Sequence, residues 1–220
     1  MIKGDLRRAR MVRELAARGI ANRRVLDALA QTPREPFVEE ALRTKAYDDA
    51  ALPIGEKQTI SQPYVVARMC ELTEPDGTGR VLEIGSGSGY HAAVLSQLFE
   101  QVYSVERIAA FSKRARETVR ALHIENVHFK IFDGSYGWSE FAPFRAIVVT
   151  AVAPEVPAPL LDQLEDGGRL VLPIAAPGAT SSDAPEQTMI RIVKDPAGIR
   201  REDHGPCRFV PLLGKFGWTT

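Results

Sequence analysis

The sequence predicts an α/β protein built on a doubly wound, mostly parallel sheet. Apolar runs typical of strands alternate with helical patterns through residues 81–173. The run at residues 145–150 is almost continuously apolar, which suits a strand that is covered on both faces. A turn with alternating glycines, at Gly85, Gly87 and Gly89, separates the first of these strands from the helical pattern that follows it. These observations favour an α/β domain that binds a ligand at this turn.

Length and composition set limits on the architecture and on the partners. The chain has 220 residues, enough for one α/β domain with a small appendage. We expect a single domain over residues 1–220, with a helical and loop region at 1–60, a ligand-binding core at 61–174 and C-terminal strands at 175–220. Basic and acidic residues number 28 each, so no bulk charge attracts nucleic acid. No segment resembles a signal peptide or a membrane span, which predicts a cytoplasmic protein without a membrane partner. The two cysteines and four histidines lack metal-ligand spacing, so no metal is expected.

The N-terminal part predicts two amphipathic helices and then an irregular segment. The helices are expected over residues 6–18 and from a cap at Asn22 to Thr32. Their many arginines are compatible with an RNA-binding arm or with a solvated helix face, and the lack of interleaved aromatic residues favours the solvated face. Residues 46–55 are rich in turn formers. A third helix follows, for which Ser61 is placed as the N-cap and Pro63 lies in the first turn.

The remaining elements follow from periodicity. Strands are expected at residues 102–105, 127–132, 145–150 and 169–173, and helices at 109–122 and 157–164. Residues 175–187 read as an exposed loop, and strands at 188–194 and 207–213 are expected to pair antiparallel at one edge. Cys70 lies in an apolar helical pattern and is expected to be buried, whereas His91, at a helix start, suits a capping or surface role.

The glycine turn has the chemistry of a nucleoside site. Glycine permits positive φ and close approach of a ligand to the backbone, and the following helix start offers free amides. The dinucleotide fingerprint places its third glycine where this chain has Tyr90. Glu106 ends the next apolar run and can accept hydrogen bonds from ribose hydroxyls. Because S-adenosylmethionine and NAD both contain ribose, Glu106 does not choose between them.

Several segments together resemble one enzyme family. With Glu83 inside the strand, residues 81–90 resemble the first motif of S-adenosylmethionine-dependent methyltransferases. Residues 52–55, 58–63, 104–107, 133–134 with 137–138, 143–144, 150–151 with 154–157, and 208–212 are similar to protein-L-isoaspartate (D-aspartate) O-methyltransferases and keep their order along the chain. The resemblance implies a class I, Rossmann-like methyltransferase fold. It also implies methyl transfer from S-adenosyl-L-methionine to the free carboxylate of L-isoaspartyl and D-aspartyl residues in damaged proteins and peptides, with S-adenosyl-L-homocysteine as the product.

The same resemblance assigns residues to the site. For the cofactor it implies Thr59, Ile60, Ser61, Glu83, Gly85, Ser86, Gly87, Gly89, Glu106, Asp133 and Gly134. Ser61 matches the family's active-site serine and would orient the substrate carboxylate, while Arg208, Phe209 and Val210 would help to hold the peptide. A carboxyl group with a pKa of about 4 is ionised at neutral pH, so this reaction needs no general base. The chain departs from the family pattern at Phe132 and at residues 135–136, which affects the expected adenine contacts, and also at residues 152–153.

Other functions remain open on the sequence. One is a methyltransferase acting on RNA or on a small molecule, although amino-methylating enzymes carry Asn or Asp before Pro-Pro and an aromatic residue where this chain reads Thr150-Ala151-Val152-Ala153-Pro154. Another is a cofactor-binding domain without catalysis, and a third is an NAD-dependent oxidoreductase. The expected partners are isoaspartyl-containing proteins and peptides, with no nucleic acid and no membrane. The enzyme itself is expected to be a monomer.

The choice of nucleoside gives a first test. A ligand that binds only the folded state at 100 times its Kd stabilises that state by about 2.7 kcal/mol. S-adenosyl-L-homocysteine is therefore expected to raise the melting temperature, whereas NAD at the same concentration leaves it unchanged. A rise with NAD alone, in a thermal shift measurement, would reverse the choice.

Overall fold

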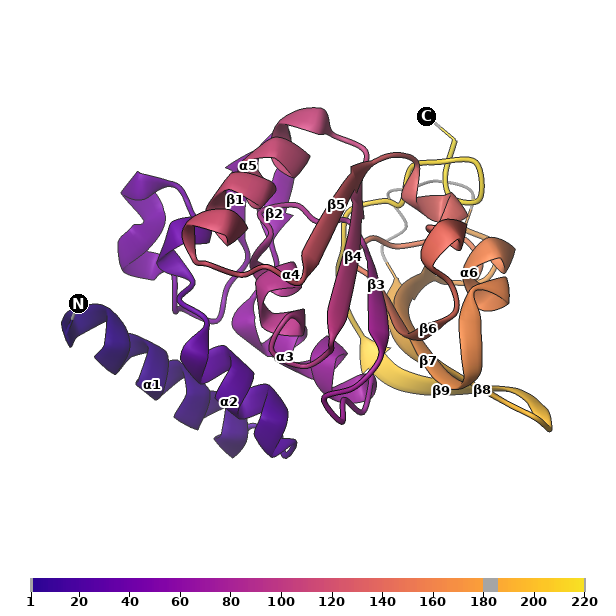
Figure 1. Cartoon of the computed structure of the whole chain (residues 1–220), viewed down its shortest axis with the longest axis horizontal. Helices are drawn as coiled ribbons and strands as arrows, with labels where there is room; N and C mark the ends of the chain where they lie inside the picture. The colour runs from indigo at the N-terminus through magenta and orange to yellow at the C-terminus, as the bar shows by residue number, and fades with distance from the viewer. Residues whose placement is uncertain (1, 180–185, 220) are drawn as a thin grey trace.

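A seven-stranded sheet in the order β5-β4-β3-β6-β7-β8-β9 forms the centre of the structure, which is a computed structural model describing residues 2–179 and 186–219 (Figure 1). Strands β5, β4, β3, β6 and β7 run parallel to one another. Strand β8 then pairs antiparallel with β7, and β9 pairs antiparallel with β8. The strand bounds are β3 (Arg80–Ile84), β4 (Gln101–Glu106), β5 (Val127–Ile131), β6 (Phe144–Val149), β7 (Leu164–Ala175), β8 (Gln187–Asp195) and β9 (Gly198–Pro206). The predicted doubly wound, mostly parallel sheet is confirmed.

Helices cover both faces of this sheet. They are α3 (Pro63–Leu72), α4 (Tyr90–Leu95), α5 (Ala109–Ala121) and α6 (Ala158–Asp162). Successive strand residues point to opposite faces, so Val81 and Val148 join the core beneath α3, α4 and α5, while Leu82 and Val149 join the core beneath α6. Because both faces are covered, the central strands are apolar at nearly every position, as parallel strands are.

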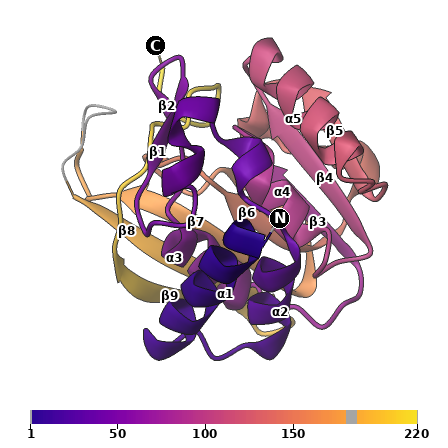
Figure 2. The ribbon, with the colours of Figure 1, turned by 90° about the vertical axis from the view of Figure 1, so that its left-hand side faces the viewer.

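Two N-terminal helices, α1 (Ile2–Ala17) and α2 (Arg23–Gln31), pack on α3 (Figure 2). The Asn22 side chain caps α2 by accepting a hydrogen bond of 3.3 Å from the amide of Val25. Met11, Leu15 and Leu29 are buried in the same core as the central strands. The 3₁₀ turns η1 (Glu35–Phe37) and η2 (Glu40–Lys45) then lead toward the sheet. The predicted helices are confirmed, and their apolar faces belong to the main core.

The segment predicted to be irregular contains a β-hairpin. Strands β1 (Leu52–Gly55) and β2 (Gln58–Ile60) pair antiparallel. Glu56 and Lys57 connect them with φ values of 47° and 57°. Positive φ at both central residues is typical of a type I′ turn, which usually carries Asn-Gly. The sequence lacks this signal, so the hairpin was not predicted.

The prediction of two antiparallel C-terminal strands is correct for the first strand but wrong for the residues of its partner. Strand β8 pairs antiparallel with β9 through a turn at residues 196–197. Residues 207–213, predicted as the partner strand, form only isolated bridges, which pair Val152 with Pro211 and Leu213 with Trp218. Strand β9 escaped prediction because it is a charged edge strand, with Arg200, Arg201 and Glu202 in sequence.

The predicted loop at residues 175–187 is only partly described. Ala175 ends β7 and Gln187 begins β8, and residues 180–185 lie outside the described residues. No helix among the residues that the structure describes is long and apolar enough to cross a membrane.

Three further 3₁₀ or helical turns lie in the connections after β5 and β6. These are η3 (Gly134–Tyr136) after β5, η4 (Ser139–Phe141) before β6, and the short α6. Trp138 packs against Tyr103 and Phe141 with ring centroids 5.5 and 5.2 Å away. Trp218 is buried, and its indole N–H donates to the Val152 carbonyl at 3.0 Å. Both tryptophans are therefore packing residues.

Candidate active site

A cavity lies where the chain reverses its direction across the sheet. From β3 the chain builds β4 and β5 on one side and then crosses back to place β6 on the other side of β3. In open α/β sheets, ligands bind at such a switch point, outside the carboxyl ends of the strands. The cavity is lined there by Ile84 and Gly85 after β3, by Glu106 at the end of β4 and by Thr150 after β6. It encloses about 950 Å³, including its open mouth.

The three glycines of the turn have different structural roles. Gly85 has a φ of +96°, and an added Cβ would lie 2.3 Å from Thr150 Oγ1, which itself donates to the Gly85 carbonyl at 2.8 Å. Gly87 (φ +50°) lines the cavity and has free space beside it, since an added Cβ would meet only Ile54, at 3.6 Å. Gly89 does not line the cavity, because it begins α4 and faces Ala115 of α5, 2.9 Å from an added Cβ. The structure thus gives Gly89 a helix-packing role, and its contact with the cofactor stays a prediction.

Glu106 connects β4 to the glycine turn. One carboxylate oxygen accepts from the Gly87 amide at 3.0 Å and the other accepts from the Ile108 amide at 2.9 Å. The side chain is buried and lines the cavity. Each carboxylate oxygen has about two acceptor positions, so one on each oxygen remains for a ligand. Glu106 is therefore arranged to accept two neighbouring hydroxyl groups, the arrangement expected for a ribose site.

Residues of the β1–β2 hairpin form one wall of the cavity. Thr59, Ile60 and Ser61 all line it. The prediction that Ser61 caps α3 is wrong, because the N-cap is Gln62 and the first-turn amide of Tyr64 donates to the Asp49 side chain instead. Proline at the first helical position makes the preceding residue the extended one. Ser61 therefore lies one residue outside the helix, and its hydroxyl is not used for capping.

A chain of buried polar groups lies beneath the turn. Ser104 Oγ donates to one carboxyl oxygen of Glu83 and lies 2.5 Å from Ser86 Oγ. The other carboxyl oxygen of Glu83 is 3.8 Å from His91 Nδ1, and His91 Nε2 is 3.3 Å from Cys70 Sγ. Ser86 and His91 line the cavity, whereas Glu83 lies in β3, fully buried, and does not. Glu83 therefore lies beneath the residues that line the cavity, and its predicted part in cofactor binding stays a prediction.

Burial sets the charges of this polar chain. It raises the pKa of Glu83 to about 8 and lowers the pKa of His91 to about 4. Both groups are thus neutral near pH 7. The predicted surface or capping role of His91 is wrong, because Gly89 begins the helix and the His91 ring is buried. Cys70 is fully buried, as predicted.

The residues predicted to bind adenine divide between two neighbouring hollows. Gly134 lines the main cavity, and Asp133 lines an adjoining hollow that shares Arg107 and Leu213 with it. One Asp133 oxygen accepts from the Ser135 amide at 2.9 Å, and the other accepts from the Lys215 amide at 2.8 Å. Asp133 therefore ties the C-terminal segment to the end of β5, in addition to any contact with a ligand.

The departure at Phe132 has a structural counterpart. Its side chain is 43% exposed, and its ring lies 5.7 Å from Tyr136, which in turn lies 5.1 Å from Phe216. Phe132 also lines the hollow that contains Asp133. An aromatic side chain at this position therefore stands beside the expected adenine site without filling the main cavity.

The predicted substrate segment reaches the cavity only at one residue. Val210 lines the cavity, and its carbonyl accepts from the Val152 amide at 2.8 Å. Phe209 is held outside by Gln187, whose side chain accepts from the Phe209 amide at 2.7 Å, and Arg208 is exposed. The structure therefore places Val210 in the site and Arg208 and Phe209 behind or beside it.

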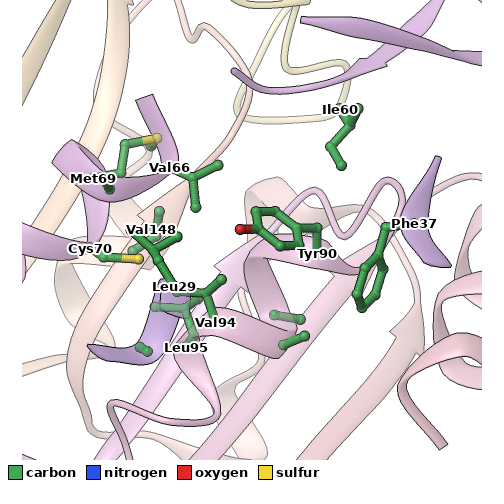
Figure 3. Close-up of a cluster of buried hydrophobic side chains, with 14 of the residues drawn as sticks. Leu29, Phe37, Ile60, Val66, Met69, Cys70, Tyr90, Val94, Leu95 and Val148 are labelled. Carbon is green, nitrogen blue, oxygen red and sulfur yellow. The ribbon is translucent and has the colours of Figure 1, made fainter. Parts of the chain in front are cut away.

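Some cavity residues were not predicted. Tyr90 and Thr150 line it, as do Arg107, Ile108 and Phe111. Tyr90 is buried among apolar side chains, with its ring edge toward Phe37 at a centroid distance of 5.6 Å (Figure 3). In the sequence Tyr90 was noticed only because it interrupts the dinucleotide fingerprint. Its place in the wall depends on contacts with the distant N-terminal segment.

Comparisons with known proteins agree on one family. The model of the family Protein-L-isoaspartate(D-aspartate) O-methyltransferase (PCMT) matches residues 6–217. Protein-L-isoaspartate O-methyltransferase 2 of Geotalea uraniireducens is 51% identical over 221 residues, covering 100% of this chain and 99% of the relative. Protein-L-isoaspartate O-methyltransferase of Pseudomonas syringae pv. tomato is 51% identical over 207 residues, covering 94% and 95%.

Solved structures give the same result for the fold. A protein-L-isoaspartate O-methyltransferase structure superposes with a TM-score of 0.85 at 32% identity, covering 96% of this chain and 67% of that chain. A Plasmodium falciparum protein described as a beta-aspartate methyltransferase, in complex with S-adenosyl-L-homocysteine, superposes with a TM-score of 0.77 at 24% identity and covers 94% and 98%. At that identity the second structure supports the fold alone.

Replacing Glu83 by glutamine is expected to change how stability depends on pH. Between the ordinary pKa of 4.5 and the folded-state pKa of about 8, the folded chain holds a proton on Glu83 that the unfolded chain has lost. The free energy of unfolding therefore falls as pH rises through this window. His91 opposes this below about pH 6.5, because its pKa falls from 6.5 to about 4 on folding. The net decline is expected from about pH 6.5 to 8, at up to about 1.4 kcal/mol per pH unit.

Urea unfolding across this pH range measures the effect. The unsubstituted chain should lose stability, whereas Glu83→Gln should show little decline. Glu140→Gln, at an exposed position in η4, serves as the control and should decline like the unsubstituted chain. An unchanged decline in Glu83→Gln would show that another group titrates.

Proposed function

The chain belongs to the protein-L-isoaspartate(D-aspartate) O-methyltransferase family, and from this premise we propose how its own residues carry out the reaction. It is an S-adenosylmethionine-dependent enzyme that methylates isoaspartyl residues in proteins. The observation that carries the assignment of roles is that Ser61, the glycine turn and Glu106 line a single cavity at the switch point of the sheet.

The residues of this cavity fit S-adenosyl-L-methionine. The open space beside Gly87 lets a ligand lie against the backbone, and the free acceptor positions of Glu106 suit the two ribose hydroxyls. We propose that Gly85, Ser86, Thr59 and Ile60 surround the methionine end and that Gly134, with Asp133 nearby, meets the adenine. When bound, the cofactor supplies a methyl group that its sulfonium already activates for transfer.

The protein contributes orientation and the exclusion of water. The acceptor carboxylate is ionised at neutral pH and needs no base to remove a proton. Apolar side chains of Ile60, Ile84 and Val210 line the cavity, so water around the nucleophilic oxygen is reduced on binding. We propose that the Ser61 hydroxyl donates a hydrogen bond to the carboxylate and directs one of its oxygens toward the methyl group.

The peptide is proposed to bind across the mouth of the cavity, beside Val210. Residues 208–212 are held by main-chain hydrogen bonds to Val152, whose amide donates to the Val210 carbonyl and whose carbonyl accepts from the Leu212 amide, each at 2.8 Å. This anchoring presents a rigid backbone segment to the substrate. Recognition through a main-chain segment suits an enzyme that must accept an altered linkage in many sequence contexts.

The alternatives have less support. Methylation of RNA gains no support from the net charge, since basic and acidic residues are equal in number. A cofactor-binding domain without catalysis leaves the presence of Ser61 in the cavity wall unexplained. We propose that the enzyme acts as a single-domain monomer in the cytoplasm, on damaged proteins and not on nucleic acid.

Two peptides that differ in one linkage test the function. One contains a normal aspartate and the other the same residue linked through its side-chain carboxyl. With methyl-labelled S-adenosyl-L-methionine, base-labile methyl ester is expected on the isoaspartyl peptide alone. Binding of S-adenosyl-L-homocysteine without transfer to either peptide would contradict this substrate class, and labelling of transfer RNA would favour the alternative.

Ser61→Ala tests the role of the hydroxyl. A hydrogen bond to a charged group contributes about 1.5–3 kcal/mol, so kcat is expected to fall about 10- to 100-fold. The Kd for S-adenosyl-L-homocysteine, measured by calorimetry, should change less than about threefold, because the substrate carboxylate is not part of that complex. Ser139→Ala, at an exposed serine of η4, should behave like the unsubstituted enzyme. Weaker cofactor binding with unchanged turnover would show that the hydroxyl serves the cofactor.

A further inference from the structure

Arg34 is a buried cation in the segment between α2 and η1. It is the largest of the fully buried side chains, with a relative exposure of 0%. Burying a guanidinium group removes it from water at a cost of several kcal/mol unless a counter-charge and hydrogen bonds compensate. The contacts of Arg34 therefore need an explanation.

Those contacts do not include a carboxylate partner. Its Nη2 donates to the Ser61 carbonyl at 2.6 Å, and its guanidinium carbon lies 4.6 Å from the centroid of the Tyr90 ring. Its Nε and Nη1 have no hydrogen-bond partner, and no ion pair among the described residues involves it. Burial lowers the pKa of Arg34, yet a guanidinium group remains protonated near neutral pH.

The neighbouring acids are bound elsewhere. Glu35, the next residue in the chain, accepts a hydrogen bond from Tyr47 Oη. Asp49 pairs with Arg18 and accepts from the Tyr64 amide at 2.8 Å. Asp49 acts on Arg34 only from a distance, and no carboxylate among the described residues forms an ion pair with its positive charge.

Both groups that Arg34 contacts form the wall of the active-site cavity. Ser61 and Tyr90 line it, and the guanidinium group lies directly behind them. Figure 3 shows the Tyr90 ring between Phe37 and the side of the cluster that contains Val66, so apolar groups surround this region. In such surroundings a charge is poorly screened and its effect reaches further than it would in water.

We propose that Arg34 is a positioning and specificity residue for the methyl acceptor. Through its hydrogen bond it fixes the Ser61 main chain so that the hydroxyl faces the substrate, and its unpaired positive charge favours a carboxylate over a neutral group at that place. Arg34 acts through Ser61 and need not touch the substrate. The inference rests on the proposed function, because it takes the acceptor to be the isoaspartyl carboxylate.

The charge of Arg34 should affect binding of the peptide and binding of the cofactor differently. It attracts an anionic acceptor, whereas it does not attract the cationic sulfonium of S-adenosyl-L-methionine. Removal of the charge is therefore expected to weaken peptide binding without weakening cofactor binding. A residue that only supported the fold would instead lower the amount of active enzyme and leave the peptide KM unchanged.

Two substitutions separate charge from hydrogen bonding. Arg34→Gln keeps a donor but removes the charge, and Arg34→Lys keeps the charge but loses the planar fork. For the isoaspartyl peptide, KM is expected to rise at least about tenfold in Arg34→Gln and to change less than about threefold in Arg34→Lys. The Kd for S-adenosyl-L-homocysteine should change less than about threefold in both. Arg114→Met is the matched control, because Arg114 Nη2 also donates to a main-chain carbonyl, that of Ile54 at 2.9 Å, from an exposed position.

The measurements distinguish failure of this inference from failure of the proposed function. If the unsubstituted enzyme methylates neither peptide, the proposed function is wrong whatever Arg34 does. If it methylates the isoaspartyl peptide and Arg34→Gln keeps the same KM with only a lower melting temperature, Arg34 is structural and the inference is overturned.

A second readout covers the case in which Arg34→Gln fails to fold. For the unsubstituted enzyme and for Arg34→Lys, the KM of the isoaspartyl peptide is compared with the inhibition constant of its carboxamide analogue, in which the acceptor group is neutral. Arg34→Lys is expected to keep the preference for the carboxylate while its kcat falls, because the lysine side chain does not reproduce the hydrogen bond from Nη2 to the Ser61 carbonyl. An unchanged kcat, or loss of the preference despite the retained charge, would overturn the inference.

Discussion

The two hydrogen bonds of the Glu106 carboxylate hold the site together. One oxygen accepts from the Gly87 amide and the other from the Ile108 amide, so this one side chain joins the end of β4 to both the glycine turn and the start of α5. The positive φ values of the turn direct its backbone toward the cavity, and Thr150 holds Gly85 from the opposite strand. Remaining acceptor capacity on Glu106 then serves the ligand, so the group that shapes the site also binds there.

Beneath this turn the protein keeps a carboxyl group where apolar residues would be expected. Burial makes Glu83 neutral near pH 7, and Ser104 and Ser86 extend its hydrogen bonding toward the cavity. A neutral acid is far less costly to bury than a carboxylate. Arg34 is more costly to bury than Glu83, because it keeps its charge and no carboxylate among the described residues pairs with it. Neutral Glu83 is stable without a ligand in the site, whereas the charge of Arg34 is stabilised most when an anion is bound.

The two ends of the chain complete the cavity. The N-terminal segment supplies Arg34, Phe37 and the hairpin with Thr59 and Ile60, and the C-terminal segment adds Val210 beside Val152. Their packing into the main core, through residues such as Leu29, means that the acceptor side of the site depends on global stability.

The sequence by itself determined the alternation of strands and helices in a mostly parallel sheet, the glycine turn, the position of Glu106 and the family, because strand periodicity, turn chemistry and motif spacing are local properties. Contacts between distant segments decided the rest. Ser61 lies outside the helix because Pro63 makes Gln62 the cap, and Glu83 lies beneath the cavity because of the pleat of β3. The partner strand of β8 was misplaced because an edge strand can be wholly polar. Nothing in the local pattern around Arg34 indicates that it packs behind Ser61, since that contact exists only when the N-terminal segment has folded onto the sheet.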